Sequence, residues 1–151
     1  MIHHEIRKAS TADASALSTL IQDAVRVSNS RDYNQAIIEL ICANFALDRV
    51  IEKMEQRDVF VAASDCVVVG TVSLGQGKLH SLFVAPEHQG GGIGRRSVEY
   101  LERHAVGKGL SELWLSSSIT AKPFYTKLGY ELVHFEERPD GSTFLMKKPL
   151  L

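Results

Sequence analysis

The sequence predicts an α/β fold, in which a mixed, largely antiparallel sheet of about seven strands is flanked by about four helices. Two runs with helical apolar spacing come first, in residues 14–24 and 37–54. β-Branched runs then follow one another from residue 59 to residue 84, with only short turns between them. Strands and helices alternate in the remainder, so hairpins and crossover helices are expected to share one sheet.

The N-terminal third is predicted to run strand, helix, helix. Residues 2–8 suit a short strand, and Ser10 to Asp13 offer capping side chains before the first helical run. A polar break at residues 28–34 separates that helix from the second, which we expect to break near Asn44.

The remaining elements begin with a hairpin of residues 59–63 and 67–74, which leads into a strand over residues 79–84. The elements expected after it are a helix over 92–108, a strand over 110–116, a helix over 120–128, and strands over 130–136 and 143–148. Asp140-Gly141, between the last two strands, is a strong turn signal.

The composition is that of an ordinary globular protein. With 151 residues, of which 44% are hydrophobic and 23% charged, the chain is expected to form a single domain over residues 1–151. A formal net charge of −1 provides no field that would attract nucleic acid or an anionic membrane. No apolar run approaches the roughly 20 residues that span a bilayer. We therefore expect a cytoplasmic protein with neither nucleic acid nor membrane as a partner.

The cysteines and histidines show no spacing typical of a metal or redox site. Cys42 lies in an apolar helical pattern and Cys66 lies beside a valine run, so we expect both thiols to be buried. The six histidines have no ligand spacing with cysteines or carboxylates. We predict no metal.

A glycine-rich loop between a predicted strand and a predicted helix carries the clearest functional signal. The loop consists of Gly90, Gly91, Gly92, Ile93 and Gly94. Glycine permits positive φ and close backbone approach, and the N–H groups at a helix start lack intrahelical partners. Arg95 and Arg96 add positive charge. The loop is therefore predicted to bind an anion such as a pyrophosphate.

Two common phosphate-binding motifs do not fit this loop. A Walker A loop requires a glycine followed by Lys and then Ser or Thr, which the chain does not contain. A dinucleotide fingerprint that begins at Gly90 requires glycine where Arg95 stands. Both departures count against a nucleotide-binding enzyme.

The pattern Q-x-x-G-x-G from Gln89, preceded by V-x-P from Val84, resembles the cofactor loop of the GNAT acetyltransferase superfamily. The segment SITAKPFYTKLGY of residues 118–130 is similar to the family's N-x-x-A-x-x-F-Y-x-K-x-G-F signature. The resemblance covers nearly the whole chain. It implies the GNAT fold, with splayed fourth and fifth strands, and an acetyl-CoA-dependent N-acetyltransferase, EC class 2.3.1.

The resemblance also implies which residues bind the acyl donor. Backbone groups of Leu82, Phe83 and Val84 would pair with the pantetheine arm of acetyl-CoA. Gln89 and the amides from Gly90 to Arg95 would hold the pyrophosphate. Ser118 stands where the family commonly has asparagine, and its shorter hydroxyl is a candidate cofactor ligand.

Tyr125 occupies the family's tyrosine position and would donate a proton to the departing CoA thiolate. The general base is open. His80 is a candidate because a histidine pKa near 6.5 suits proton transfer at neutral pH. A water chain that ends at His80, Glu136 or Glu137 is an equal alternative. No cysteine nucleophile lies at the loop, which favours direct attack in a ternary complex.

The acceptor is expected to be a primary amine of a small molecule or peptide. Residues 31–33 resemble in position the segment that shapes the acceptor pocket in the family, and they are also compatible with a solvated turn. Acidic residues at 131, 136, 137 and 140 are candidates to attract a cationic amine. The alternative function is a non-catalytic acyl-CoA sensor or interaction module, and a homodimer is a possible assembly.

Overall fold

The computed structural model describes residues 4–150, and this part of the chain forms seven strands and five α-helices. The strands are β1 (Glu5–Lys8), β2 (Asp58–Ser64), β3 (Val67–Gly75), β4 (Lys78–Val84), β5 (Glu112–Ser118), β6 (Glu131–Glu136) and β7 (Thr143–Pro149). The helices are α1 (Ala14–Ser28), α2 (Gln35–Ala43), α3 (Leu47–Gln56), α4 (Ile93–Gly107) and α5 (Lys122–Lys127). Short 3-10 turns at Thr11–Asp13 and Pro86–His88 precede α1 and the glycine loop.

The predicted element order is confirmed. The long second helical run is divided into α2 and α3, because the chain leaves the helix at Asn44 and re-enters it after Ala46. The strand expected over residues 110–116 starts two residues later, at Glu112. The predicted first strand began at residue 2, and its first two residues lie outside the described part of the chain.

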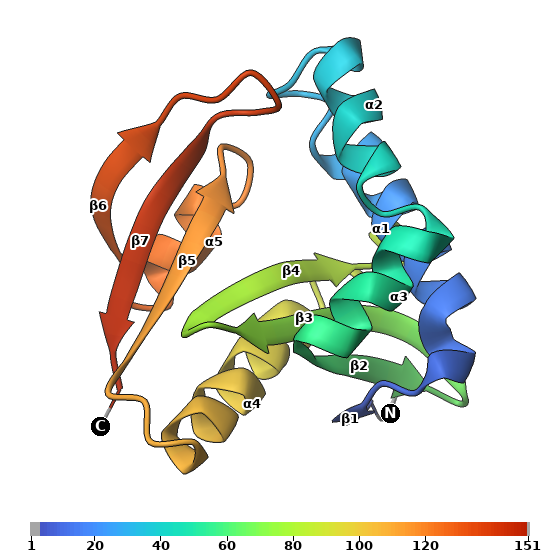
Figure 1. Cartoon of the computed structure of the whole chain (residues 1–151), viewed down its shortest axis with the longest axis horizontal. Helices are drawn as coiled ribbons and strands as arrows, with labels where there is room; N and C mark the ends of the chain where they lie inside the picture. The colour runs from blue at the N-terminus through green and yellow to red at the C-terminus, as the bar shows by residue number, and fades with distance from the viewer. Residues whose placement is uncertain (1–3, 151) are drawn as a thin grey trace.

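The sheet has the order β1-β2-β3-β4-β5-β7-β6 (Figure 1). Its neighbouring strands are antiparallel, except for the parallel pair of β4 and β5 that the crossover through α4 creates. This is the mixed, largely antiparallel sheet that the sequence predicts.

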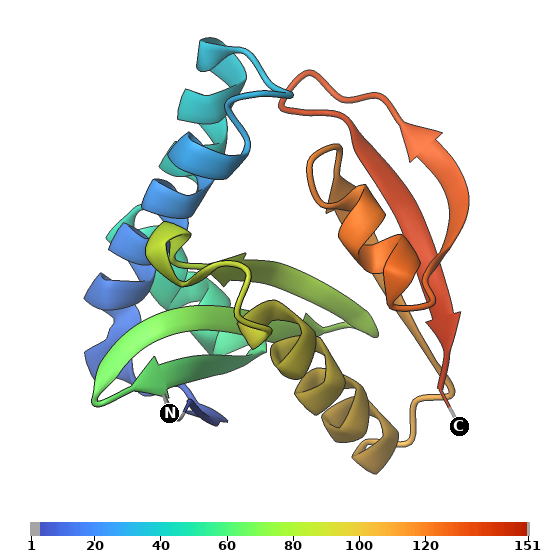
Figure 2. The same ribbon diagram turned by 180° about the vertical axis from the view of Figure 1, so that it is seen from behind.

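Helices cover both faces of the sheet. Leu17, Ile21 and Val25 of α1 pack with residues of α2, α3 and β2 in one apolar cluster. Val98 and Leu101 of α4 are fully buried in a second cluster, which includes side chains of β3 and β5. α4 lies across the N-terminal half of the sheet, and α5 lies against the C-terminal strands, as Figure 2 shows.

β4 and β5 pair over only two residue pairs, Lys78 with Trp114 and Leu79 with Leu115. Beyond them the strands separate, and the sheet opens into two arms (Figures 1 and 2). A bulge accompanies the separation: β4 contains one residue more than β3 between the paired positions, and Ser81 has φ +53. The splay that the family resemblance implies is therefore present.

One expectation about the cysteines is wrong. Cys42 is buried in the α1–α2 cluster, but Cys66 is exposed. Cys66 lies in the turn between β2 and β3, where it and Asp65 have positive φ. The tight turn of the hairpin directs the Cys66 side chain towards solvent. The valines that follow it in β3 are therefore no guide to the burial of Cys66.

Asp13 links β1 to the start of α1. Its carboxylate accepts hydrogen bonds from Arg7 Nη1 and Nη2 at 2.8 and 3.0 Å, and from the Ser10 backbone N–H at 2.8 Å. The hydrogen bonds from Arg7, with help from Ser10, lower the pKa of Asp13 from 3.8 to about 2 although burial opposes this shift.

We expect Asp13→Asn to lower the free energy of unfolding by about 1–2 kcal/mol at pH 7, because the native state holds the ionised carboxylate preferentially. The lowered pKa of Asp13 contributes its full stabilisation above the unfolded value of 3.8, and this contribution is lost as the pH falls to the folded value of about 2. The difference in stability between the variant and the wild type should therefore fade between about pH 4 and pH 2. Urea unfolding across that range measures it. Asp23→Asn, on the exposed side of α1, is the matched control. A difference that persists undiminished at pH 2 would contradict the electrostatic origin.

Candidate functional site

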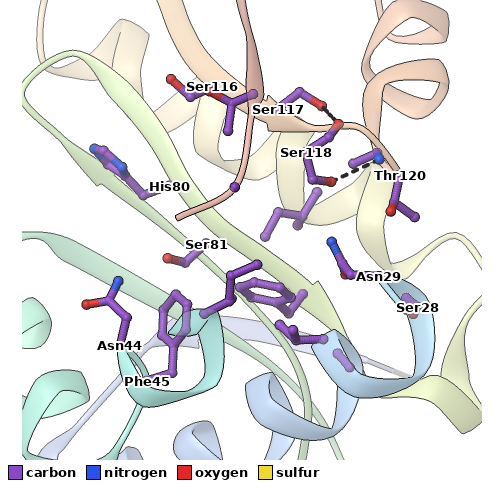
Figure 3. Close-up of a pocket in the computed structure, with 18 of the residues that line it drawn as sticks. Ser28, Asn29, Asn44, Phe45, His80, Ser81, Ser116, Ser117, Ser118 and Thr120 are labelled. Atoms are coloured by element: carbon purple, nitrogen blue, oxygen red, sulfur yellow. Dashed lines mark hydrogen bonds between the residues drawn. The ribbon is translucent and has the colours of Figure 1, made fainter. Parts of the chain in front are cut away.

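A cavity of about 420 Å³ lies where β4 and β5 separate. Its walls come from α1, α2, α3, β4, β5, α5 and the connection between β6 and β7. Figure 3 shows His80 and Ser81 on β4, facing the serines at the end of β5 across the opening. Of the residues predicted for the site, the cavity brings together Tyr125, His80, Leu82, Phe83, Val84, Gln89 and Ser118.

The glycine loop presents unused donors. No backbone N–H from Gly90 to Arg95 donates a hydrogen bond to another residue within 4–150, and the first paired amide is that of Arg96, which donates to the Gly92 carbonyl at 3.0 Å. Gly90 and Gly92 have φ of +84 and +88, which favours glycine. Unpaired donors at the start of a 15-residue helix form a site for an anion.

Gln89 anchors this loop with its side chain. Its Nε2 donates to the Val84 carbonyl at 3.1 Å and to the Ser28 hydroxyl at 3.0 Å. The side chain therefore ties the end of β4 to the end of α1. A ligand that used the same Val84 carbonyl would share it with Gln89, and a carbonyl oxygen has two lone pairs.

Gly94 allows α4 to approach α5. A Cβ atom at this position would lie 3.3 Å from Cζ of Phe124 and 3.7 Å from Cγ2 of Val84. Because Phe124 precedes Tyr125, this close approach couples the position of the anion cradle to that of the predicted proton donor.

Tyr125 is 5% exposed, and its ring packs edge-on against the rings of Phe124 and Tyr130. Its hydroxyl makes no hydrogen bond to any residue within 4–150, and the residue lines the cavity. Burial raises the pKa of Tyr125 well above its usual value, so the phenol stays protonated at neutral pH. A fixed, unpartnered O–H group is thus available to a molecule in the cavity.

Ser118 ends β5, and its hydroxyl accepts a hydrogen bond from the Ala121 N–H at 3.0 Å. This contact caps the start of α5, as Figure 3 shows. The hydroxyl proton of Ser118 has no acceptor within the described residues, so the group can still donate into the cavity.

His80 does not keep an ordinary pKa. Burial and, to a smaller extent, the nearby charge of Arg57 lower the pKa of His80 from 6.5 to about 4. The expectation of a value near 6.5 is therefore wrong, because the sequence did not show how deeply the ring is enclosed. Nε2 lies 3.2 Å from the Gly75 carbonyl, which accepts from it and leaves Nδ1 of the neutral ring as an acceptor.

The connection between α1 and α2 fastens the two arms of the sheet together. The Tyr33 hydroxyl donates to the Ser142 carbonyl at 2.8 Å and accepts from the Ile119 N–H at 2.9 Å. Nearby, Thr120 donates to the Asp32 carboxylate at 2.7 Å. This segment is therefore a bridge across the cavity rather than a freely solvated turn.

Comparison with known proteins identifies the family. Residues 26–150 match the model of the acetyltransferase (GNAT) domain. The chain belongs to the GNAT acetyltransferase family. It is 31% identical to the uncharacterized N-acetyltransferase YafP of Escherichia coli, across 85% of this chain and 82% of that protein. It is 32% identical to an IAA acetyltransferase of Azospirillum brasilense, across 72% of this chain and 78% of the relative.

Solved structures of acetyltransferases have the same fold. A GCN5-related N-acetyltransferase from Rhodopseudomonas palustris superposes with a TM-score of 0.93 at 21% identity, covering 99% of this chain and 98% of the other. The PaiA N-acetyltransferase of Thermoplasma acidophilum, solved in complex with coenzyme A, gives 0.82 at 22% identity, covering 97% and 99%. As a member of the GNAT family, the protein is an acyltransferase. Within residues 4–150, no helix has the length and apolar character needed to cross a membrane.

The cavity of this acetyltransferase also contains polar residues that sequence reasoning missed. Asn29 is buried at the end of α1, its side-chain amide has no hydrogen bond within 4–150, and Figure 3 shows it on the side of the cavity that carries Thr120. Lys53 of α3 and Arg57, the residue that follows this helix, also line the cavity. Asn29 was assigned to a polar break. Lys53 and Arg57 are half-buried and lie three and seven residues after the buried Val50, so their helical spacing was the local signal that could have marked them.

The acidic residues near the last strands contribute little to the cavity. Among them only Asp140 lines it. Glu136 forms an ion pair with Arg138 at 3.1 Å, and Glu131 is exposed at the start of the edge strand β6. Their expected role in attracting a cationic amine therefore lacks support from their placement.

We expect Tyr33→Phe to lower the free energy of unfolding by about 1–3 kcal/mol, because it leaves the Ile119 N–H and the Ser142 carbonyl without their partner. Thermal unfolding measures the loss, and hydrogen exchange should show faster exchange at the Ile119 amide. Tyr100→Phe is the control, since the Tyr100 hydroxyl makes no hydrogen bond within 4–150. Unchanged exchange at Ile119 would show that the bridge does not hold the two arms.

Proposed function

We propose that the chain is a single-domain, acetyl-CoA-dependent N-acetyltransferase, which transfers the acetyl group to a primary amine of a small molecule or peptide by direct attack in a ternary complex. One arrangement carries the proposal. The cavity is lined by the unpartnered Tyr125 and reaches Gln89, the residue before the unpaired amides of Gly90 to Arg95, which themselves lie outside its lining. An anion cradle next to a cavity that holds a proton donor suits a long acyl donor with a pyrophosphate and a thioester.

The donor would be held mainly by backbone. Its pyrophosphate would lie on the N–H groups from Gly90 to Arg95, where the unpaired donors and the helix dipole both favour negative charge. The pantetheine arm would run along Leu82, Phe83 and Val84, on the edge of β4 from which β5 has separated. Ser118 faces this edge across the cavity and would add one hydroxyl donor.

In the proposed reaction, the amine nitrogen attacks the thioester carbonyl, a C–N bond forms, and the C–S bond breaks. Tyr125 donates its hydroxyl proton to the departing sulfur, and the attacking nitrogen loses one proton to a base. Nδ1 of the neutral His80 is one acceptor for that proton. Glu136 and Glu137 do not line the cavity, so the alternative route to either carboxylate would require a chain of water molecules. No cysteine lines the cavity, so no acyl-enzyme is required.

Tyr125→Phe should lower kcat by about 100-fold or more, the usual scale for losing a general acid, while KM for acetyl-CoA changes little. Steady-state release of the CoA thiol with a saturating amine measures both constants. Tyr130→Phe is a stringent control, because it removes a neighbouring buried hydroxyl that donates to Glu102 at 2.7 Å. It should cost stability but leave kcat intact. Unchanged turnover in Tyr125→Phe would remove this residue from the mechanism.

Gly92→Ala tests the cradle. The new methyl group forces a left-handed residue to bear a Cβ, at a cost of about 1–2 kcal/mol, and shifts the amides that would meet the pyrophosphate. We expect the Kd for CoA, measured by calorimetry, to rise at least tenfold.

Gly109→Ala provides the matched control for Gly92→Ala. Gly109 lies just beyond the other end of α4 with nearly the same φ, +89 against +88, and the backbone strain is therefore similar. Both variants should lose comparable stability, but only Gly92→Ala should weaken CoA binding. Equal CoA affinities in the two variants would show that the loop does not bind the cofactor.

A further inference from the structure

The α3 wall of the cavity carries two cations that have no counter-ion. Arg57 follows the last residue of α3, and Lys53 lies one turn before it. Within residues 4–150, neither side chain forms an ion pair with a carboxylate. The Arg57 guanidinium also donates no hydrogen bond there. Lys53 Nζ donates only to Asn44, at 2.7 Å from its carbonyl and 3.3 Å from its Oδ1.

Both cations are partly withdrawn from water. Burial lowers the pKa of Lys53 and of Arg57, which shows that their charged forms lack the solvation or the anion that would compensate for enclosure. Cations are common in the last turn of a helix because they stabilise its own final carbonyls. Lys53 instead contacts the carbonyl of Asn44 after α2, and Arg57 contacts none. The helix dipole therefore does not account for either position.

Gly75 contacts both Arg57 and His80. A Cβ atom on Gly75 would lie 2.9 Å from Cγ of Arg57, so only glycine leaves room for the aliphatic part of this side chain. The Gly75 carbonyl accepts the hydrogen bond from His80. One residue thus lies against the aliphatic part of Arg57 and accepts the hydrogen bond from the His80 imidazole.

A free hydroxyl lies next to this pair. Ser81 lines the main cavity and also a small adjoining cleft that Lys53 and Arg57 share. Its hydroxyl makes no hydrogen bond within the described residues. Arg57, Lys53 and Ser81 therefore border the small cleft together, and no carboxylate lines that cleft.

We infer that the acceptor is a small amine that also carries a carboxylate or phosphate group, and that Arg57, assisted by Lys53, binds this anionic group. The inference rests on the proposed acetyl transfer and makes it more specific. A guanidinium matches the geometry of carboxylate and phosphate oxygens in two parallel hydrogen bonds. The cavity of about 420 Å³ must also admit the end of the acyl donor, which leaves space for a small acceptor.

The same arrangement gives the anion a second effect. The charge of Arg57 is one of the causes that lower the pKa of His80, and Lys78 acts in the same direction. An anion bound to Arg57 would offset part of that charge, so His80 would become a better proton acceptor when the correct acceptor is present.

Matched pairs of amines test the inference with the wild-type enzyme and saturating acetyl-CoA. Glycine and β-alanine are compared with their amides, phosphoethanolamine is compared with ethanolamine, and 1,4-diaminobutane is the cationic probe. We expect at least one anionic amine to exceed its neutral partner tenfold or more in kcat/KM. Comparison of the amino acids with phosphoethanolamine shows whether a carboxylate or a phosphate is preferred. A preference for neutral or cationic amines would overturn the inference.

Arg57→Met removes the charge but keeps an apolar side chain against Gly75. We expect kcat/KM for the preferred anionic amine to fall roughly 10- to 100-fold, mainly through KM, with the neutral partner little affected. Arg57→Lys should recover part of the loss. Arg49→Met, an exposed position of the same helix outside the cavity, is the control for the lost charge. An anion preference that survives Arg57→Met would also overturn the inference.

A binding measurement separates this inference from the proposed function. The CoA complex is titrated with glycine and with phosphoethanolamine, and the imidazole signals of His80 are followed by NMR. Shifts that occur in the wild type and in Arg49→Met, but not in Arg57→Met, support the anion site even if no amine is acetylated. If the His80 signals of the wild type do not shift, the proposed anion site is wrong. If CoA binds but no amine is acetylated, only the proposed transferase reaction is contradicted.

Discussion

The separation of β4 from β5 is the constraint on which the rest of the site depends. Two neighbouring strands in a sheet normally satisfy each other's backbone groups, but these two pair only at Lys78–Trp114 and Leu79–Leu115. The bulge at Ser81 turns β4 away and prevents the ladder from closing. The opening leaves a polar strand edge along a cavity, and the Tyr33 hydrogen bonds hold its far end at a fixed width.

Positive potential in and next to the cavity comes from two different sources. At the start of α4 it comes from backbone amides, which glycine exposes and which remain at any pH. At the α3 wall it comes from the side chains of Lys53 and Arg57. The first kind of site suits a donor common to a family, and the second suits a choice among acceptors. Tyr125 and His80 also line the cavity, one kept protonated and one kept neutral by burial.

The sequence predicted the element order, the position of the glycine loop and the segment around Tyr125, because each depends on residues close together in the chain. Hydrophobic periodicity located α1 and α4, and the Asp140-Gly141 turn separated the last two strands. Prediction failed where an environment is assembled from distant segments. The pKa of His80 depends on Arg57, more than twenty residues away. The exposure of Cys66 depends on how the β2–β3 turn is oriented.

The sequence by itself predicted an anion-binding helix start and located a GNAT-type tyrosine segment, because the spacing of a motif can be recognised without knowing how the chain packs. Only the tertiary structure decided what surrounds them. It brought α3 against the β3–β4 hairpin, so that Gly75 accommodates Arg57 and two cations face the cavity. It also showed that most of the acidic residues lie elsewhere. The charge within a cavity depends on which side chains from distant segments line it, and a local sequence pattern does not show which distant segments come together.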